Sequence, residues 1–132
     1  MKKKEFWYKL PPFTFSVVAL LTLFYFTLVP QPLPPFEPPM LNFDKVVHVV
    51  MMFLVSTAIM LDFKRRERQC ELSLSTKIYI TIATIALGAF IELAQGTELI
   101  HRGCDVLDGV ANAVGCIMAF FVAPPLLRKL LK

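Results

Sequence analysis

Three long apolar stretches of this chain each contain a single ionisable side chain. These residues are His48 in the stretch 46–61, Glu92 in the stretch 78–95 and Asp108 in the stretch 106–123. Carboxyl and imidazole groups are the usual general acids and bases of enzymes. Ionisable groups in apolar segments are rare because burying them costs free energy, so each one is a functional candidate. We therefore take His48, Glu92 and Asp108 as the candidate catalytic residues.

More polar residues lie at helical spacing from these three. The candidate ligand-binding residues are Asp44, Lys45, Gln95, Arg102, Asp105 and Asn112. Residues three or four positions apart share one face of a helix, so each set would form a polar stripe. At 1.5 Å per residue, the buried members would lie about 5–6 Å below the same end of their helices. The spacing therefore predicts one polar pocket built by three helices.

The composition places these stripes in a membrane protein. The chain has 132 residues, of which 56% are hydrophobic and 18% are charged, and its mean hydropathy is +0.61. Soluble domains have about 25% charged residues and roughly 45–50% apolar ones. The apolar excess is too large for one small core, and it excludes intrinsic disorder. Three cysteines, an odd number, argue against a disulfide scaffold.

Prolines divide the apolar sequence into blocks of membrane-spanning length. All ten prolines lie at positions 11–12, 30–39 or 124–125, and proline interrupts helix interiors. A helix needs roughly 17–25 residues to cross a bilayer. We therefore expect an all-α fold, a four-transmembrane-helix bundle in a single membrane domain, 1–132. The expected helices cover about 12–29, 44–62, 77–95 and 105–124, with a Pro-rich external loop at 30–43 and a basic cytoplasmic loop at 63–77.

The first block has a second interpretation. It follows Lys2, Lys3 and Lys4, as the apolar region of a cleaved signal peptide would. Its seventeen uncharged residues exceed the usual length of about 7–15 for such a region, and no small-residue cleavage pattern follows. A transmembrane helix is therefore the preferred interpretation of this block.

The basic residues predict the orientation of the bundle. Twelve of the fourteen lie in the two terminal segments and the 63–77 loop, and the other two are Lys45 and Arg102. Cytoplasmic loops collect Lys and Arg, so we expect both termini to be cytoplasmic and the polar pocket to face outward. The expected partner is the lipid bilayer. A nucleic-acid partner is not expected, because no soluble domain is present to bind one.

Each polar residue also has a structural interpretation. Asp44 would cap the second helix, and His48 would be a neutral packing residue. Gln95, Asn112 and the two buried acids would hydrogen-bond across the bundle. Small residues at every fourth position of the last helix predict close packing against a neighbour; they are Ala111, Gly115 and Ala119.

The arrangement of these motifs resembles the VanZ-like family of bacterial membrane proteins. The matching segments are DKVVH around His48, IELAQ around Glu92, and RGCDVLDGVANAVG from Arg102 to Gly115, within residues 42–120. The family often has a Tyr where this chain has Met52, so no role for that Tyr is transferred. The resemblance implies a multi-pass protein of the bacterial inner membrane and a link to teicoplanin-type glycopeptide resistance. It does not imply a particular reaction.

Two functional hypotheses follow. In the first, the protein binds or processes an envelope lipid or a lipid-linked precursor. Lys45 and Arg102 would hold a phosphate or carboxylate, and the candidate catalytic residues would transfer protons. No metal site is required by the spacing. A divalent cation is compatible with the carboxylates, because hard cations take oxygen ligands; they are Asp44, Glu92, Asp105 and Asp108.

In the second hypothesis the protein is not an enzyme. The polar residues would then fix helix packing, conduct protons or ions, or support docking of a membrane protein or a second copy of the chain. Four short helices with small loops leave little room for a substrate chamber, which favours this alternative. The Pro-rich loop, stiff and extended, would serve as a spacer or a docking surface.

Overall fold

The structure, a computed structural model, describes residues 3–29, 42–67, 71–97 and 103–131. All regular secondary structure in these residues is helical, as the sequence predicts. The helices are α1 (Lys3–Lys9), α2 (Thr14–Leu28), α3 (Phe43–Glu67), α4 (Leu74–Gln95) and α5 (Val106–Leu130). The predicted Pro-rich loop at 30–43 lies outside the described residues except for its last two positions. Arg102 also lies outside them.

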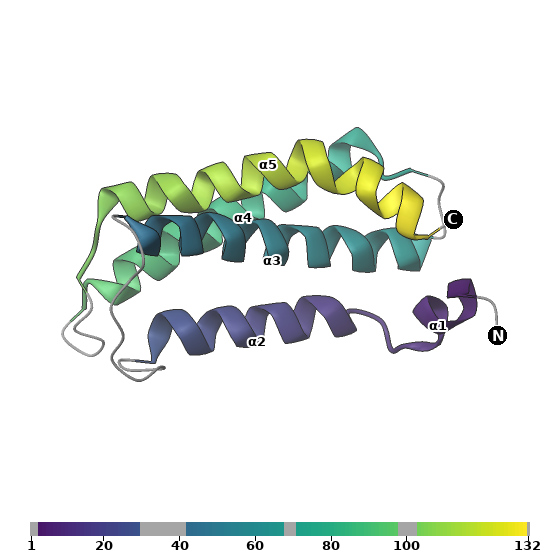
Figure 1. Cartoon of the computed structure of the whole chain (residues 1–132), viewed down its shortest axis with the longest axis horizontal. Helices are drawn as coiled ribbons and strands as arrows, with labels where there is room; N and C mark the ends of the chain where they lie inside the picture. The colour runs from purple at the N-terminus through teal and green to yellow at the C-terminus, as the bar shows by residue number, and fades with distance from the viewer. Residues whose placement is uncertain (1–2, 30–41, 68–70, 98–102, 132) are drawn as a thin grey trace.

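Helices α2 to α5 run antiparallel to one another in chain order (Figure 1). Helices α3 and α5 begin at the end where α2 and α4 finish, and this end is called the site end below. At the opposite end, called the basic end, lie α1 and the last turns of α5. Helix α3 packs against each of the other three long helices, and its interface with α5 is the largest.

Three of the helices are long and apolar enough to cross a membrane, namely α3, α4 and α5. Helix α2 has 15 residues, which at 1.5 Å per residue is about 22 Å, short of a hydrocarbon core of about 30 Å. The structure therefore confirms an all-helical chain with three helices capable of crossing a membrane. The predicted fourth crossing is shorter in the structure than in the sequence-based estimate.

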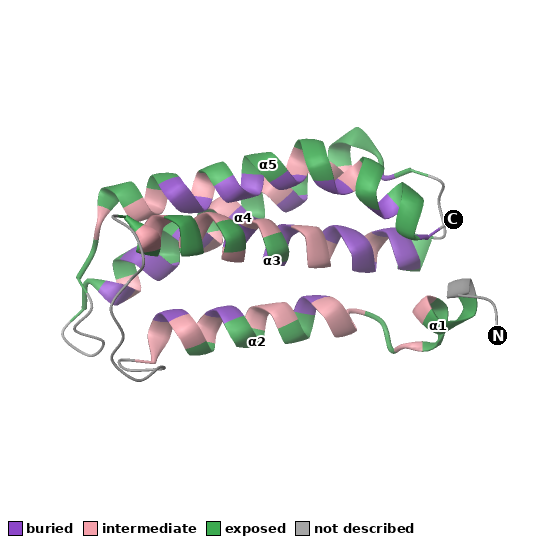
Figure 2. Cartoon of the chain, viewed as in Figure 1, coloured by how far each residue is buried: buried purple, intermediate pink, exposed green. Residues whose placement is uncertain are grey.

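Large apolar side chains cover the outside of the bundle (Figure 2). Leu21, Leu54, Tyr79 and Phe121 are each more than half exposed. Two hydroxyl groups are buried between α3 and α4, where the Ser56 hydroxyl donates to the Thr84 hydroxyl across 3.1 Å. An apolar exterior with hydrogen-bonded polar groups between helices is the pattern that a lipid environment favours.

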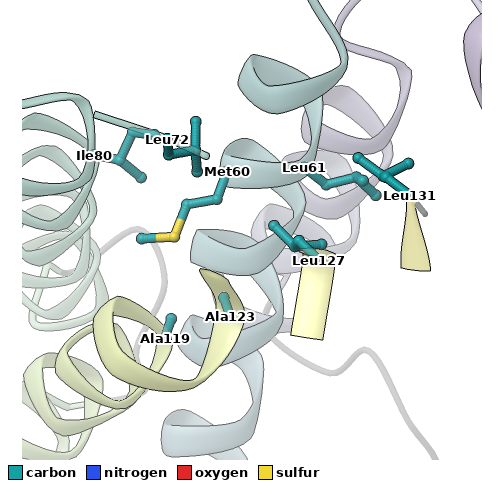
Figure 3. Close-up of a cluster of buried hydrophobic side chains, with 8 residues drawn as sticks. All are labelled: Met60, Leu61, Leu72, Ile80, Ala119, Ala123, Leu127 and Leu131. Atoms are coloured by element: carbon teal, nitrogen blue, oxygen red, sulfur yellow. The ribbon is translucent and has the colours of Figure 1, made fainter. Parts of the chain in front are cut away.

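Two clusters of apolar side chains fill the bundle. Figure 3 shows the cluster nearer the basic end, where Met60 of α3 lies between Ile80 of α4 and the alanines of α5. The second cluster lies nearer the site end and is formed by Leu23, Met52, Val55, Ile91 and Cys116. Together the two clusters join all four long helices. The polar residues at the site end therefore lie next to a packed apolar core.

Helix α5 continues past its predicted end at about residue 124. It includes Pro124 and Pro125 and reaches Leu130. Each proline removes one backbone donor, a loss that membrane helices tolerate where neighbours pack against them. Leu127, one turn later, is 1% exposed within the Figure 3 cluster, and its carbonyl accepts from Leu131 N–H at 3.0 Å. Burial of Leu127 explains why the helix does not stop at the prolines.

The predicted basic loop at 63–77 is also mostly helical. Helix α3 extends to Glu67, and α4 starts at Leu74. Ser73 is the N-cap of α4, because its hydroxyl accepts from the backbone N–H of Thr76. Arg65, expected in this loop, is instead buried. Its guanidinium donates to Asp62 Oδ1 at 2.6 Å and to the carbonyl oxygens of Trp7 and Leu10 at 2.6 and 2.9 Å.

Asp62 connects this arginine to α2. Its Oδ2 accepts from the backbone N–H of Ser16 at 2.7 Å and from the Ser16 hydroxyl at 2.8 Å. Asp62 and Arg65 are 2% and 6% exposed. The pair therefore fastens α2 and the segment before it onto α3 at the basic end, a role that the sequence analysis did not foresee.

Removal of the Asp62 carboxylate should leave Arg65 buried without its counter-charge. Asp62→Ala should lower the free energy of unfolding by about 3–5 kcal/mol, the usual cost of breaking a buried pair. Ser16→Ala removes one of several donors to this carboxylate and should cost less, about 1.5–3 kcal/mol. Reversible unfolding in detergent micelles measures both. Equal losses for the two variants would contradict the ion pair as the main fastening.

The stripe of small residues on α5 does face another helix. Ala111, Gly115 and Ala119 are all buried. A Cβ atom added to Gly115 would clash with the backbone carbonyl oxygen of Val49 and lie 3.1 Å from Met52 Cβ. Helices α3 and α5 therefore approach each other closely because position 115 has no side chain.

Gly115→Ala should push α3 and α5 apart and cost about 1–3 kcal/mol of unfolding free energy, because backbone atoms cannot give way. Gly109→Ala on the same helix is the matched control. Its added Cβ would be 3.8 Å from the nearest atom, so the change should be neutral or stabilising. A Gly115→Ala protein as stable as Gly109→Ala would show that the close approach is not required.

Candidate functional site

Polar side chains from three helices meet at the site end. The set, called the polar cluster below, consists of Asp44, Lys45 and His48 from α3, Glu92 from α4, and Asp105, Asp108 and Asn112 from the start of α5. All seven are candidate site residues of the sequence analysis. The structure brings them into one connected set of contacts, whereas their functional roles stay predictions.

The starts of helices α3 and α5 set the positions of Lys45 and Asp105. Helix α3 starts after Asn42, which has φ 60° and whose carbonyl accepts from Lys45 N–H at 3.1 Å. Helix α5 starts after Asp105, whose carboxylate accepts from Leu107 N–H at 2.9 Å as a helix cap. These two starts place Lys45 beside Asp105 and the first turn of α5.

Lys45 is the cation at the centre of the acidic groups. Its ammonium lies 3.2 Å from Asp44 Oδ2, 3.0 Å from Asp105 Oδ2 and 2.9 Å from Asp108 Oδ1. The ammonium of Lys45, and next the N–H of Leu107, hold the pKa of Asp105 below its ordinary value, so Asp105 is ionised at neutral pH. An ammonium engaged with three carboxylates has little capacity left for the phosphate that the sequence analysis assigned to it.

His48 lies between the two deeper acids. Its Nδ1 is 3.7 Å from Glu92 Oε1 and its Nε2 is 3.7 Å from Asp108 Oδ2. Nδ1 is also 2.9 Å from the Asn112 side-chain oxygen. The imidazole is therefore within reach of both carboxylates, with one of its nitrogens already hydrogen-bonded.

Asn112 determines which imidazole nitrogen carries the proton. Its amide nitrogen lies 3.5 Å from Glu92 Oε1 and 3.5 Å from the Gly88 carbonyl oxygen, which can only accept. The amide oxygen must then face His48 and accept from Nδ1–H. In the neutral imidazole this leaves a lone pair on Nε2, the nitrogen nearest to Asp108.

Glu92 is the most deeply buried acid of the cluster, at 4% exposed. The donors that approach it from the described residues are both distant: Asp105 N–H lies 3.4 Å from Oε2 and the Asn112 amide nitrogen 3.5 Å from Oε1. Hydrogen bonds to ionised carboxylates are usually about 2.7–2.9 Å long. The Glu92 carboxylate is therefore weakly solvated by its described neighbours.

Gln95 does not join the polar cluster. Its side-chain amide donates to the Thr27 carbonyl oxygen at 2.8 Å, and the residue is 5% exposed. It thus ties the end of α4 to the end of α2, which agrees with the structural interpretation of this residue. Arg102, the other candidate cation, lies outside the described residues.

Sequence reasoning overlooked two polar contacts elsewhere in the bundle. The Asp62–Arg65 pair could have been suspected, because Asp62 directly follows an apolar stretch and Ser16 lies within another. The Ser56–Thr84 hydrogen bond left no such signal, since isolated hydroxyl residues are common in membrane helices. Neither contact lies at the site end.

Comparison with known proteins adds no assignment. The chain matches no protein-family model, and neither a curated protein nor a solved structure shows significant similarity to it. Function must therefore be argued from the polar cluster itself.

The geometry predicts an uncommon tautomer for His48. Selective ¹⁵N labelling of histidine and NMR at a pH where His48 is neutral should show the proton on Nδ1. Asn112→Leu removes the acceptor of that N–H, and the tautomer ratio should then move toward Nε2–H, the form usually favoured without such a bond. A wild-type protein with the proton on Nε2 would contradict the assigned orientation of Asn112.

Proposed function

We propose that this chain is a multi-pass protein of the bacterial inner membrane, with both termini in the cytoplasm and the polar cluster facing outward. The described basic residues at the basic end support this orientation, because cytoplasmic segments collect them. They are Lys9, Lys64, Arg65, Arg66, Lys77, Arg128 and Lys129. Helix α2, which lies antiparallel to α3, is the fourth membrane crossing.

We propose further that the polar cluster binds and processes the headgroup of an envelope lipid or a lipid-linked precursor. The observation that carries this proposal is His48, held 3.7 Å from both Glu92 and Asp108 inside a bundle with an apolar exterior. Placing three ionisable groups from three helices together inside an apolar bundle costs free energy, so such groups are functional candidates. His48 and Asp108, with 15% of each side chain exposed at the site end, are accessible to a headgroup, whereas Glu92 is buried.

The roles follow from the contacts. Nε2 of His48 carries the free lone pair and accepts a proton from the bound headgroup or from water. Asp108 faces the same nitrogen and stabilises the imidazolium that forms. Glu92 lies on the Nδ1 side and would favour the same charged form. Lys45 holds Asp108 in position, and Asn112 fixes the imidazole ring.

The resemblance to the VanZ-like family supports this choice of substrate class. That family is linked to teicoplanin-type glycopeptide resistance, which agrees with a substrate among the envelope lipids or lipid-linked precursors. A chain of this class would meet such precursors at the outward-facing polar cluster. The contribution of this chain to resistance is part of the proposal.

The direct test uses a labelled polyprenyl-pyrophosphate-linked precursor and purified protein in lipid nanodiscs. The Glu92→Gln, Asp108→Asn double variant should lose at least tenfold in retention or turnover, about 1.4 kcal/mol or more. Glu67→Gln, an exposed carboxylate of α3, is the matched control and should behave as wild type. Equal precursor retention and turnover by wild type and the double variant would rule out the proposal.

A second function is favoured by the same contacts, because they join α3, α4 and α5. In that alternative the polar cluster only fixes helix packing. The double variant would then give less folded protein and a lower melting temperature, while retention per folded molecule stayed at the wild-type value. Measuring both quantities on the same preparations separates the two functions.

A further inference from the structure

His48, Glu92 and Asp108 are arranged as ligands of one metal ion. Each can offer one ligand atom, and the three atoms all lie within 4.8 Å of one another. They come from α3, α4 and α5, so the site exists only in the folded bundle. We propose that these three residues bind one divalent transition-metal ion, with Mn²⁺ or Zn²⁺ as the fitting class. This inference rests on the proposed function, because it uses the same cluster, and it changes one role there: with an ion bound, Nε2 of His48 is a ligand and no longer the proton acceptor.

The charges of the cluster call for a second cation. Lys45 contacts one oxygen on each of three carboxylates, Asp44, Asp105 and Asp108. The other oxygen of Asp108 and the whole Glu92 carboxylate face His48 instead. Among the described residues, no other cationic side chain contacts these oxygens. Buried carboxylates without a counter-charge are expensive, so a proton or a metal ion must compensate them.

The distances favour a metal ion over a protonated imidazole. A charge-assisted N–H···O contact is about 2.7–2.9 Å long, whereas both His48–carboxylate distances are 3.7 Å. Nδ1–H is in addition already donated to Asn112 at 2.9 Å. Metal–ligand bonds of about 2.0–2.2 Å separate neighbouring ligand atoms by roughly 3–4 Å. The 3.7 Å between Nε2 of His48 and Asp108 Oδ2 fits that range. One ligand atom from each of the three residues lies within 4.8 Å of the other two, so Glu92 needs a side-chain rotation to reach that range.

The residues around the three ligands support them as a metal site would require. A metal-binding histidine usually donates its second N–H to a fixed acceptor, which orients the ring. Asn112 is that acceptor for His48. Lys45 holds the outer oxygen of Asp108 at 2.9 Å, which leaves Oδ2 turned toward Nε2. These contacts are independent of the ligand cluster and orient two of its three members.

One imidazole and two carboxylates suit Mn²⁺ or Zn²⁺ better than Mg²⁺ or Ca²⁺, which prefer oxygen ligands alone. Three protein ligands leave coordination positions open. His48 and Asp108 are partly exposed at the site end, with 15% of each side chain accessible, so a phosphate oxygen could fill an open position. A bound metal ion would supply the anion-binding charge that Lys45, engaged with three carboxylates, does not have free.

The test is Mn²⁺ binding to the purified protein after chelator treatment, without any lipid precursor. Titration followed by electron paramagnetic resonance should show one bound ion per chain. Pulsed measurements should show ¹⁴N coupling from one imidazole. Glu92→Gln and Asp108→Asn should weaken binding at least tenfold, and His48→Gln should abolish the ¹⁴N coupling. Glu67→Gln, outside the polar cluster, should retain both.

Bound Mn²⁺ without ¹⁴N coupling in the wild-type protein would overturn the inference, as would the absence of saturable binding. Both results need no variant, so misfolding of a variant does not affect them. The result also separates this inference from the proposed function. Metal binding without precursor retention refutes only the function, and precursor retention without saturable Mn²⁺ binding refutes only the metal site.

Discussion

The cost of burying charge in an apolar bundle governs both ends of this molecule. At the basic end, Asp62 and Arg65 compensate each other completely, with bonds of 2.6–2.9 Å to each other and to neighbouring backbone and serine groups. At the site end, Lys45 is equally well paired, but Glu92 and one oxygen of Asp108 are not. The first arrangement is a fastening, whereas the second is incomplete in a way that a bound proton, metal ion or ligand would complete.

Helix packing determines the positions of the incompletely paired residues at the site end. Gly115 allows α3 and α5 to approach until Met52 lies against α5, and the cluster around Ile91 and Cys116 brings α4 against both. His48, Glu92 and Asp108 then meet because each lies within about one and a half turns of the site end of its own helix. The apolar core therefore sets the distances among three ionisable side chains, and holding functional groups on a packed scaffold is the usual construction of a functional site.

Much of this design was visible in the sequence, because it depends on periodicity. Ionisable residues at helical spacing within apolar stretches indicated which faces would be polar, and their contacts join seven of the candidate residues. The sequence could not indicate that Lys45 would be engaged by three carboxylates, since that depends on how α3 and α5 are rotated. The continuation of α5 beyond Pro125 was equally hidden, because it depends on burial of Leu127. Helical periodicity predicts faces, whereas tertiary packing decides partners.

The central claim is that the polar cluster binds a ligand and is more than a packing device. Native mass spectrometry of the protein, extracted from bacterial membranes in mild detergent, tests this most directly. The account predicts a lipid-linked mass bound to the wild-type chain and absent from an equally folded chain in which Glu92 and Asp108 are replaced by their amides. The same bound mass on both proteins, or none on either, would contradict it.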